Sequence, residues 1–218
     1  MKEAIGHISR ADPKMRRLIR MVGACTLAPD RRQSPFQSLV EAVAYQQLHA
    51  SAAESILRRF RGLFENGRFP RPEAILAMDP LALRGVGFST AKSAAIRDIA
   101  ANTIEGVIPP RRTLNGMDDE DIIKRLIVVR GVGRWTVEMF LIFTLGRLDV
   151  LPLDDYGVRK GFGVIRGAAE LPDRKALLDH GERWRPYRSV AAWYLWRAAE
   201  LDAPRKRRFV DNTASRRS

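Results

Sequence analysis

Two adjacent carboxylates and an earlier tryptophan are the side chains best suited to chemistry in this sequence. Asp154 and Asp155 stand in a turn after Pro152, and Trp135 lies upstream in an apolar run. A carboxylate in a partly desolvated cleft can stabilise a developing positive charge, and an indole face can stack on a cationic ligand. Each also has a structural alternative. An aspartate at such a turn ordinarily caps the next helix, and a tryptophan in an apolar run is ordinarily core.

A glycine-flanked turn, Gly131-Val132-Gly133, precedes Trp135 and separates two apolar helical runs. Glycine tolerates positive φ and lets a ligand approach the backbone closely. A tight turn that leads into a helix N-terminus offers free N–H groups and the positive end of the helix dipole, which together can hold an anion. The turn therefore predicts a phosphate contact, with an ordinary interhelical turn as the alternative.

The charge of the chain indicates a polyanionic partner. Its 218 residues include 38 Lys and Arg against 25 Asp and Glu, a net charge of +13. Nucleic acid is the first candidate and an anionic membrane the second, with a basic but unrelated soluble enzyme as the alternative. With 45% hydrophobic residues, the chain can bury the core of one large domain or two small ones.

Cysteine usage and hydropathy exclude several classes of protein. The single cysteine, Cys25, rules out a disulfide framework and a four-cysteine zinc or iron–sulfur site. No N-terminal signal region and no apolar run of about 20 residues is present, so we expect a cytoplasmic protein that makes no membrane contact.

The elements that position these residues are expected to be helices, because no strand-like alternation extends beyond a few residues. Asp12-Pro13 and Ser34-Pro35 predict helix starts, and Ser51-Ala52-Ala53-Glu54 has the spacing of a capping box. Helices over 118–129 and 134–145 would flank the glycine turn. The aromatic-rich segment 190–201 is expected to be a core helix.

Two further places put polar side chains at helix joints. Gln47 and His49 lie between two apolar stripes, where they either project outward or satisfy exposed backbone groups. A second glycine turn, at residues 85–87, leads into a helix that Ser89 would cap, with Lys92 in its first turns. Ser89 or Lys92 could contact a phosphate there, and an ordinary capped helix is the alternative.

Taken together, the words GVGRWT and LPLDDYGVRKGF resemble the helix-hairpin-helix (HhH-GPD) DNA glycosylase superfamily, and within it the DNA-3-methyladenine glycosylase II branch. The closing segment from Trp184 to Trp196 is similar to that family too, so the resemblance covers roughly residues 10 to 200. It implies an all-α HhH-GPD fold with two helical subdomains, an active-site cleft between them and no N-terminal β domain.

The resemblance also implies how the chain is divided. A central helical bundle of residues 35–145 would contain the helix-hairpin-helix, and residues 1–34 with 146–204 would form the second subdomain. The basic tail, residues 205–218, is expected to be disordered and to add nonspecific phosphate attraction at most.

The family's motifs assign roles to individual residues. Its catalytic carboxylate directly precedes the aromatic or hydroxyl residue of the turn, which makes Asp155, before Tyr156, the expected catalytic residue and Asp154 a structural one. The remaining expectations follow by position. The base pocket would be formed by Trp135, Met139 and Tyr45, and DNA would be bound by Gln47 (the wedge that fills the gap left by an extruded nucleotide), His49, Ser89, Lys92, Gly131, Gly133 and Thr136.

The implied reaction is hydrolysis of the N-glycosidic bond of alkylated purines such as 3-methyladenine and 7-methylguanine in duplex DNA. The lyase-competent branch carries a lysine nucleophile where this chain has Trp135, so we expect a monofunctional enzyme that leaves the strand uncut. We expect a monomer with no cofactor and no metal site, although hairpin carbonyls of the family can hold a monovalent cation.

Two alternatives stay open. One is a glycosylase for another base lesion or mismatch, against which Trp135 and the missing cysteines argue. The other is a noncatalytic DNA-binding module built on the hairpin. Asp155 distinguishes the two classes, because a pure binder has no use for a carboxylate that faces DNA and repels phosphate.

Overall fold

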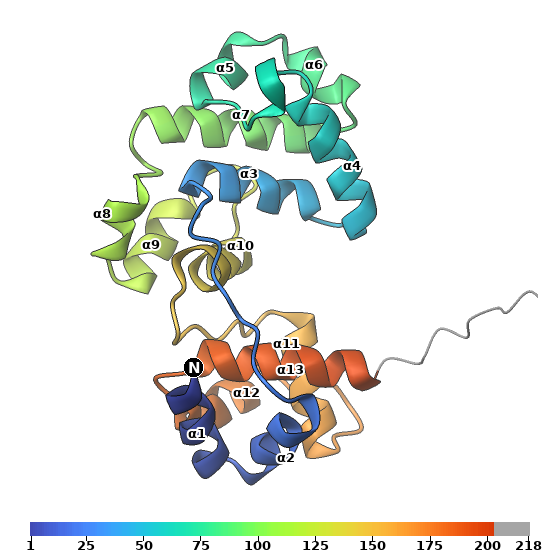
Figure 1. The fold of residues 1–218 in the computed structure, drawn as a ribbon, viewed down its shortest axis with the longest axis vertical. Coiled ribbons are helices and arrows are strands. Elements are labelled where there is room, and N and C mark those ends of the chain that lie inside the picture. Colours follow the sequence, from blue (N-terminus) through green and yellow to red (C-terminus); the bar gives the residue numbers. More distant parts are fainter. Residues whose placement is uncertain (203–218) are drawn as a thin grey trace, which may run out of the picture.

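The computed structural model describes residues 1–202, which are helical and contain no strand (Figure 1). The predicted all-α class is therefore confirmed. The predicted tail, residues 205–218, and the last two residues of the predicted second subdomain lie outside the described residues. No helix in the described part is long and apolar enough to cross a membrane.

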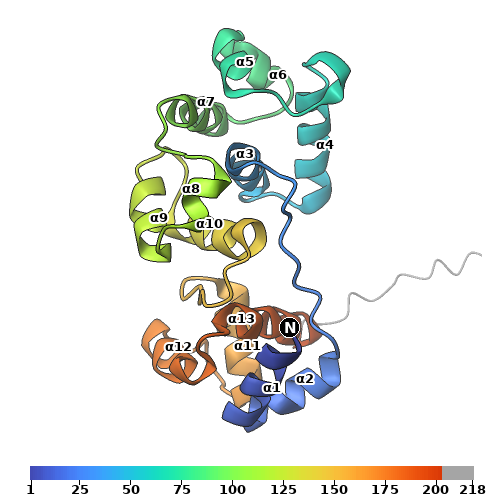
Figure 2. The same cartoon turned by 60° about the vertical axis from the view of Figure 1, so that its left-hand side comes forward.

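One hydrophobic core is built from the middle of the chain. Buried side chains such as Leu39, Ile99 and Val137 meet there. Their helices occupy the upper part of Figures 1 and 2. These helices are α3 (Pro35–Tyr45), α4 (Ala50–Arg61), α5 (Pro72–Ala77), α6 (Pro80–Gly85), α7 (Thr90–Ile104), α8 (Arg111–Asn115), α9 (Asp119–Leu126) and α10 (Arg134–Phe140), with the short 3-10 turn η1 (Glu65–Gly67) between α4 and α5.

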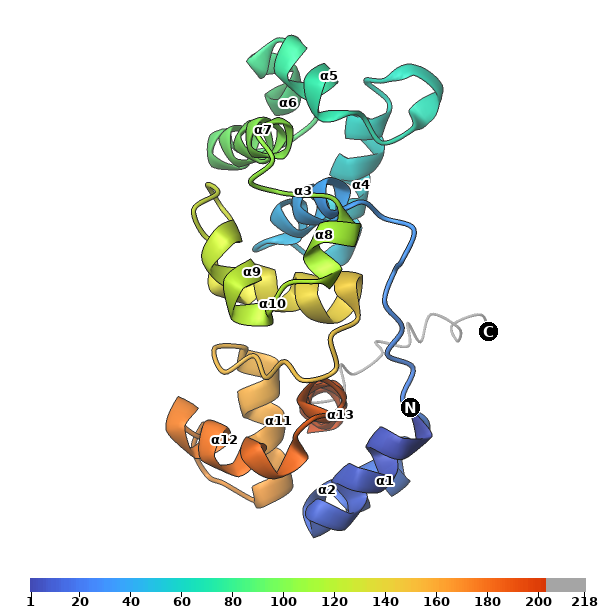
Figure 3. The ribbon, with the colours of Figure 1, turned by 90° about the vertical axis from the view of Figure 1, so that its left-hand side faces the viewer.

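A second core joins the two ends of the described chain. Phe162, Trp184 and Tyr194 are fully buried in it. Two connections, residues 23–34 and 146–155, run between the two groups of helices (Figure 3). The helices of this core are α1 (Lys2–Ala11), α2 (Pro13–Val22), α11 (Tyr156–Arg166), α12 (Arg174–Gly181), η3 (Glu182–Trp184) and α13 (Arg188–Asp202).

Side-chain caps set several of the helix starts. Asp12 accepts hydrogen bonds from Lys14 N and Met15 N at the start of α2, and Ser34 accepts one from Gln37 N at the start of α3. The predicted capping box at Ser51 is wrong. The helix α4 already begins at Ala50, and its N-cap, His49, makes no side-chain cap bond.

The predicted helix over 134–145 is also not uniform. Regular α10 ends at Phe140 and continues as one turn of π-helix, η2 (Leu141–Leu145), which ends at Gly146 with φ of 76°. Single π turns of this kind are frequent at functional sites. The connection to α11, which contains the predicted carboxylate turn, begins directly after this π turn.

Candidate active site and DNA-facing loops

Asp155 caps the next helix, as the structural alternative predicted, and its carboxylate also accepts hydrogen bonds from two tryptophans. Its Oδ1 atom accepts a hydrogen bond from Val158 N at 2.8 Å, which caps α11, and a second from Trp196 Nε1 at 2.8 Å. Its Oδ2 atom accepts from Trp135 Nε1 at 2.8 Å. The carboxylate is therefore held by three N–H donors that come from three different helices, α10, α11 and α13.

This carboxylate lies in a cleft of about 560 Å³ where α10, η2, α11 and α13 meet. Five aromatic side chains line it together with Met139 and Asp155, and the charged residues Lys160, Arg197 and Glu200 lie at its border; the aromatic ones are Trp135, Phe143, Tyr156, Trp193 and Trp196. Trp135 is 42% exposed, so the core alternative for this residue is wrong. Trp135 and Met139 lie one helical turn apart on the same face of α10, as expected.

Two residues depart from the sequence expectations here. Tyr45, expected in the base pocket, is 39% exposed and does not line this cleft. Trp196, expected in the core, is only half-buried, and its ring stacks on Phe143 at 5.6 Å between ring centres. The indole N–H of a covered tryptophan needs a hydrogen-bond acceptor, and for Trp196 that acceptor is Asp155 at the edge of the cleft.

Gly157 explains how the Trp196 indole comes so close to Asp155. A β-carbon at Gly157 would lie 2.8 Å from Trp196 Cδ1, well inside van der Waals contact. Because glycine has no side chain, the first turn of α11 can lie directly against the indole ring. A larger residue at position 157 would therefore collide with Trp196, which explains why glycine follows the Asp-Tyr pair.

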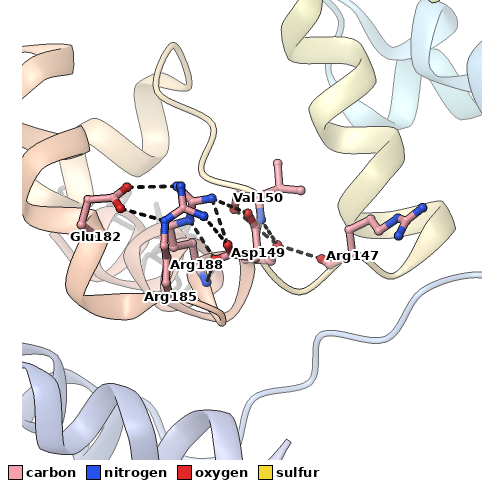
Figure 4. Close-up of polar contacts among 7 residues, drawn as sticks. Arg147, Asp149, Val150, Glu182, Arg185 and Arg188 are labelled. Carbon is pink, nitrogen blue, oxygen red and sulfur yellow. Dashed lines mark hydrogen bonds and ion pairs between the residues drawn. The ribbon is translucent and has the colours of Figure 1, made fainter. Parts of the chain in front are cut away.

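The connection before Asp155 is fixed to the start of α13, as Figure 4 shows. The Asp149 carboxylate pairs with Arg188 through contacts of 2.8 and 3.0 Å and with Arg185 at 2.8 Å. Ser189 Oγ accepts a hydrogen bond from Val150 N at 2.9 Å. Bidentate arginine–carboxylate pairs add geometric definition as well as energy, so this cluster restricts where the turn with Asp155 can lie.

Asp154 has different surroundings. It is exposed and pairs with Arg174 at 3.1 Å. It lines a larger cavity of about 690 Å³, which borders another face of α10 and contains charges of both signs. In that cavity Glu138 is 6% exposed, and burial raises its pKa to about 7 although Arg134 Nε lies 3.1 Å from its carboxylate. Of the two adjacent aspartates, Asp155 is the one that enters the aromatic cleft.

The hairpin between α9 and α10 has a closely packed turn. Gly131 has φ of 78°, and a β-carbon there would lie 2.7 Å from Ala95 Cβ on α7, so both conformation and space require glycine. Gly133 is the N-cap of α10 and has open space around it. The side chain of Thr136 is buried, which leaves its first-turn amide as the group expected to face DNA.

The loop between α3 and α4 carries Gln47 in a left-handed conformation, with φ of 56°. Gln47 and His49 are exposed, and neither side chain makes a hydrogen bond within residues 1–202. The alternative, that the side chains of Gln47 and His49 satisfy exposed backbone groups, is therefore wrong. Beside the loop, Ser89 caps α7 by accepting a bond from Lys92 N at 3.2 Å, as the capped-helix alternative predicted.

Contacts of these loop residues with DNA stay predictions, as does the monovalent cation at the hairpin carbonyls. Within the described part of the chain, no group of three or more His, Cys, Asp or Glu side chains could hold a metal ion.

Comparison with known families identifies the class of protein to which this helical fold and its carboxylate cleft belong. Residues 40–186 match the family described as the HhH-GPD superfamily of base excision DNA repair proteins. The chain belongs to this superfamily, which confirms the resemblance seen in the sequence.

Individual relatives agree with that assignment. The chain is 41% identical over 198 residues to DNA-3-methyladenine glycosylase 1 of Schizosaccharomyces pombe, covering 89% of this chain and 86% of the relative. The structure of the 3-methyladenine DNA glycosylase Mag1 of that organism in complex with abasic DNA superposes with a TM-score of 0.83 at 40% identity, covering 92% and 98% of the two chains. A DNA-3-methyladenine glycosidase of Bacillus halodurans superposes with a TM-score of 0.79 at 35% identity, covering 88% and 87%.

Proposed function

We propose that this protein is a monofunctional DNA glycosylase of base excision repair that removes alkylated purines, 3-methyladenine and 7-methylguanine among them, from duplex DNA. The observation that carries the proposal is the Asp155 carboxylate, fixed by three N–H donors inside an aromatic cleft. The relatives named as 3-methyladenine glycosylases support the same reading. We expect the protein to act as a monomer on double-stranded DNA.

In the proposed reaction the damaged nucleotide leaves the stack and its base enters the cleft. The bond between C1′ and the base nitrogen breaks, and its electron pair goes to the base. An N-alkylated purine that carried a positive charge therefore departs as a neutral molecule. Water adds to C1′ and loses its proton, and Asp155 stabilises the positive charge that develops on the sugar in between.

The aromatic lining suits such a base. The indole face of Trp135 offers electron density to a cationic ring, an interaction that strengthens when the ring is desolvated. Because a cationic purine is already a good leaving group, the reaction needs no general acid beside Asp155. The chemistry therefore matches a cleft rich in aromatic side chains in which Asp155 is the half-buried carboxylate, while Glu200, the other carboxylate of the lining, is exposed and paired with Arg197 at 2.6 Å.

Strand cleavage is not expected, because Trp135 cannot form a Schiff base with C1′. Lys160 does line the cleft, but its ammonium is paired with Asp202 at 3.2 Å. Borohydride trapping on DNA with an abasic site tests this directly: no covalent adduct should form with the wild type. An adduct that disappears in Lys160→Met would instead assign lyase activity to this lysine.

The central test is release of free bases from methylated duplex DNA by the wild type, Asp155→Asn and Asp154→Asn. Asparagine is as good an N-cap as aspartate, so Asp155→Asn should fold. Loss of the charge should reduce the rate of base release by about a hundredfold or more. The matched control Asp154→Asn should keep wild-type activity, and strands should stay intact until alkali is added.

Two results would contradict the proposal. Full activity in Asp155→Asn would remove this residue from the chemistry. A wild-type protein that releases no base but binds DNA with steep salt dependence would be a noncatalytic hairpin module. Release of a different damaged or mismatched base in place of alkylpurines would keep the enzyme class and change the substrate.

A further inference from the structure

Two side chains connect the loop that carries Gln47 to its neighbours. The Gln46 amide Nε2 donates to Gly131 O at 3.0 Å and lies 3.3 Å from Thr136 Oγ1, so it bonds to both sides of the hairpin turn. The Lys92 ammonium donates to Ala44 O at 2.8 Å and to Gln46 O at 2.7 Å. The loop is thus attached to the hairpin by one side chain and to α7 by the other.

The lysine acts at the end of a helix, where carbonyl groups have no intrahelical partner. α3 ends at Tyr45, so Ala44 O and Gln46 O lie on either side of its last residue. The Lys92 side chain is half-buried, and desolvation lowers its pKa. Two of its three N–H donors bind backbone carbonyl groups inside the protein. Lys92 is therefore placed to fix the backbone of the loop, not to contact a ligand outside.

The conformation of Gln47 shows what this attachment maintains. A positive φ is unfavourable for a residue with a β-carbon and persists when the surrounding contacts determine it. The residue directly before Gln47 is fixed at its carbonyl by Lys92 and at its side chain by the hairpin. Gln46 therefore points into the protein and Gln47, its neighbour, points out.

We propose that Gln46 and Lys92 are positioning residues that hold Gln47 at a fixed place relative to the hairpin turn. Phosphate anchoring at the hairpin and insertion of Gln47 into the duplex then occur on one rigid unit. This rests on the proposed function, which places Gln47 in the gap left by the extruded nucleotide. It assigns Lys92 a role different from a direct phosphate contact.

The test is binding to duplex DNA with an abasic site, measured at several salt concentrations for Gln46→Leu and Lys92→Met, each alone and combined with Gln47→Ala. We expect each single variant to lose about tenfold in affinity with an unchanged salt slope. In the Gln47→Ala background the same changes should cost less than about twofold, because a positioning residue has nothing left to position. Lys175→Met, a lysine substitution on α12, is the matched control.

Other outcomes overturn the proposal. A salt slope that falls by about one in Lys92→Met would show a direct phosphate contact. Losses that add fully to that of Gln47→Ala would show that the two residues act independently of it. Thermal unfolding identifies variants that fail to fold, and Gln46→Leu, which leaves the lysine contacts to backbone intact, keeps the test valid if Lys92→Met does fail.

Base release by the wild type, measured in parallel, separates this inference from the proposed function. Release of alkylpurines with additive losses rejects only the positioning roles. No release with non-additive losses rejects the glycosylase and keeps the positioning roles in a protein that binds DNA.

Discussion

Glu138 makes the stability of this protein depend on pH in a direction that is unusual for a carboxylate paired with arginine. Its side chain is 7% exposed, and burial raises its pKa from an ordinary 4.5 to about 7, against the opposing effect of Arg134. Between these two pH values the unfolded chain has lost the proton and the native state still holds it. The free energy of unfolding must therefore fall as the pH rises through this interval, and stay level above it.

The magnitude follows from the interval. Each pH unit corresponds to about 1.4 kcal/mol, so the wild type should lose about 3 kcal/mol of stability between pH 4.5 and pH 7 on account of this group. Glu138→Gln removes the titration and keeps an oxygen that can accept from Arg134 Nε. Relative to the wild type, the variant should gain about 3 kcal/mol over the same interval.

Urea denaturation of both proteins at a series of pH values from about 4.5 to 8 measures this difference. Other titrating groups, His180 among them, are present in both proteins and cancel. Glu120→Gln is the matched control on the same arginine. Glu120 is exposed, and its hydrogen bond with Arg134 lowers its pKa below the ordinary 4.5, so the stability that it contributes is already present at the start of this series. The difference in stability between Glu120→Gln and the wild type should therefore stay nearly constant from about pH 4.5 to 8. A pH-independent difference for Glu138→Gln, or a loss at high pH, would refute the reasoning and show that the Arg134 pair outweighs desolvation.

Three further predictions concern the hairpin, the cleft and the connection before α11. Gly131→Ala should lower the free energy of unfolding by about 2–4 kcal/mol through its positive φ and the close approach of α7, whereas Gly133→Ala, in open space, should fold normally and weaken only DNA binding. Trp196→Phe removes the N–H that holds Asp155 and should slow base release about tenfold in single-turnover assays, with the ring packing kept. Arg188→Met removes the bidentate partner of Asp149 on the connection before α11. Thermal unfolding should show a free energy of unfolding lower by about 2 kcal/mol.

The features that the sequence predicted are those that nearby residues determine. The caps at Asp12 and Ser34 follow from a polar residue directly before a proline, and the structure has both. The all-helical class follows from apolar spacing that persists along the chain. The family was identified from short words around the hairpin and the carboxylate turn, because both are defined by backbone geometry that few residue types can adopt.

The features that the sequence did not predict depend on contacts between distant parts of the chain. The hydrogen bond from Trp196 to Asp155 joins α13 to the start of α11, and nothing in the local pattern separates this tryptophan from its buried neighbour Trp193. Gln46 looks equivalent to Gln47 in the sequence, yet the Gln46 side chain is bonded to the hairpin, whereas the Gln47 side chain makes no hydrogen bond within the described residues 1–202. The capping box at Ser51 failed for a local reason instead, because α4 already begins at Ala50 and its N-cap is His49.

The geometry around Asp155 also bears on which bases the cleft suits. A carboxylate that caps a helix and accepts from two indoles cannot swing toward a leaving group or exchange a proton with it readily, since each movement breaks a charge-assisted hydrogen bond. It can stabilise only a charge that develops at a fixed point. Such a site has little to offer a neutral base, which needs a proton donor to depart. An alkylated purine brings its own positive charge and requires only that the sugar be stabilised as the bond breaks. The immobility of Asp155 therefore supports the same substrate class as the aromatic lining, from an independent physical argument.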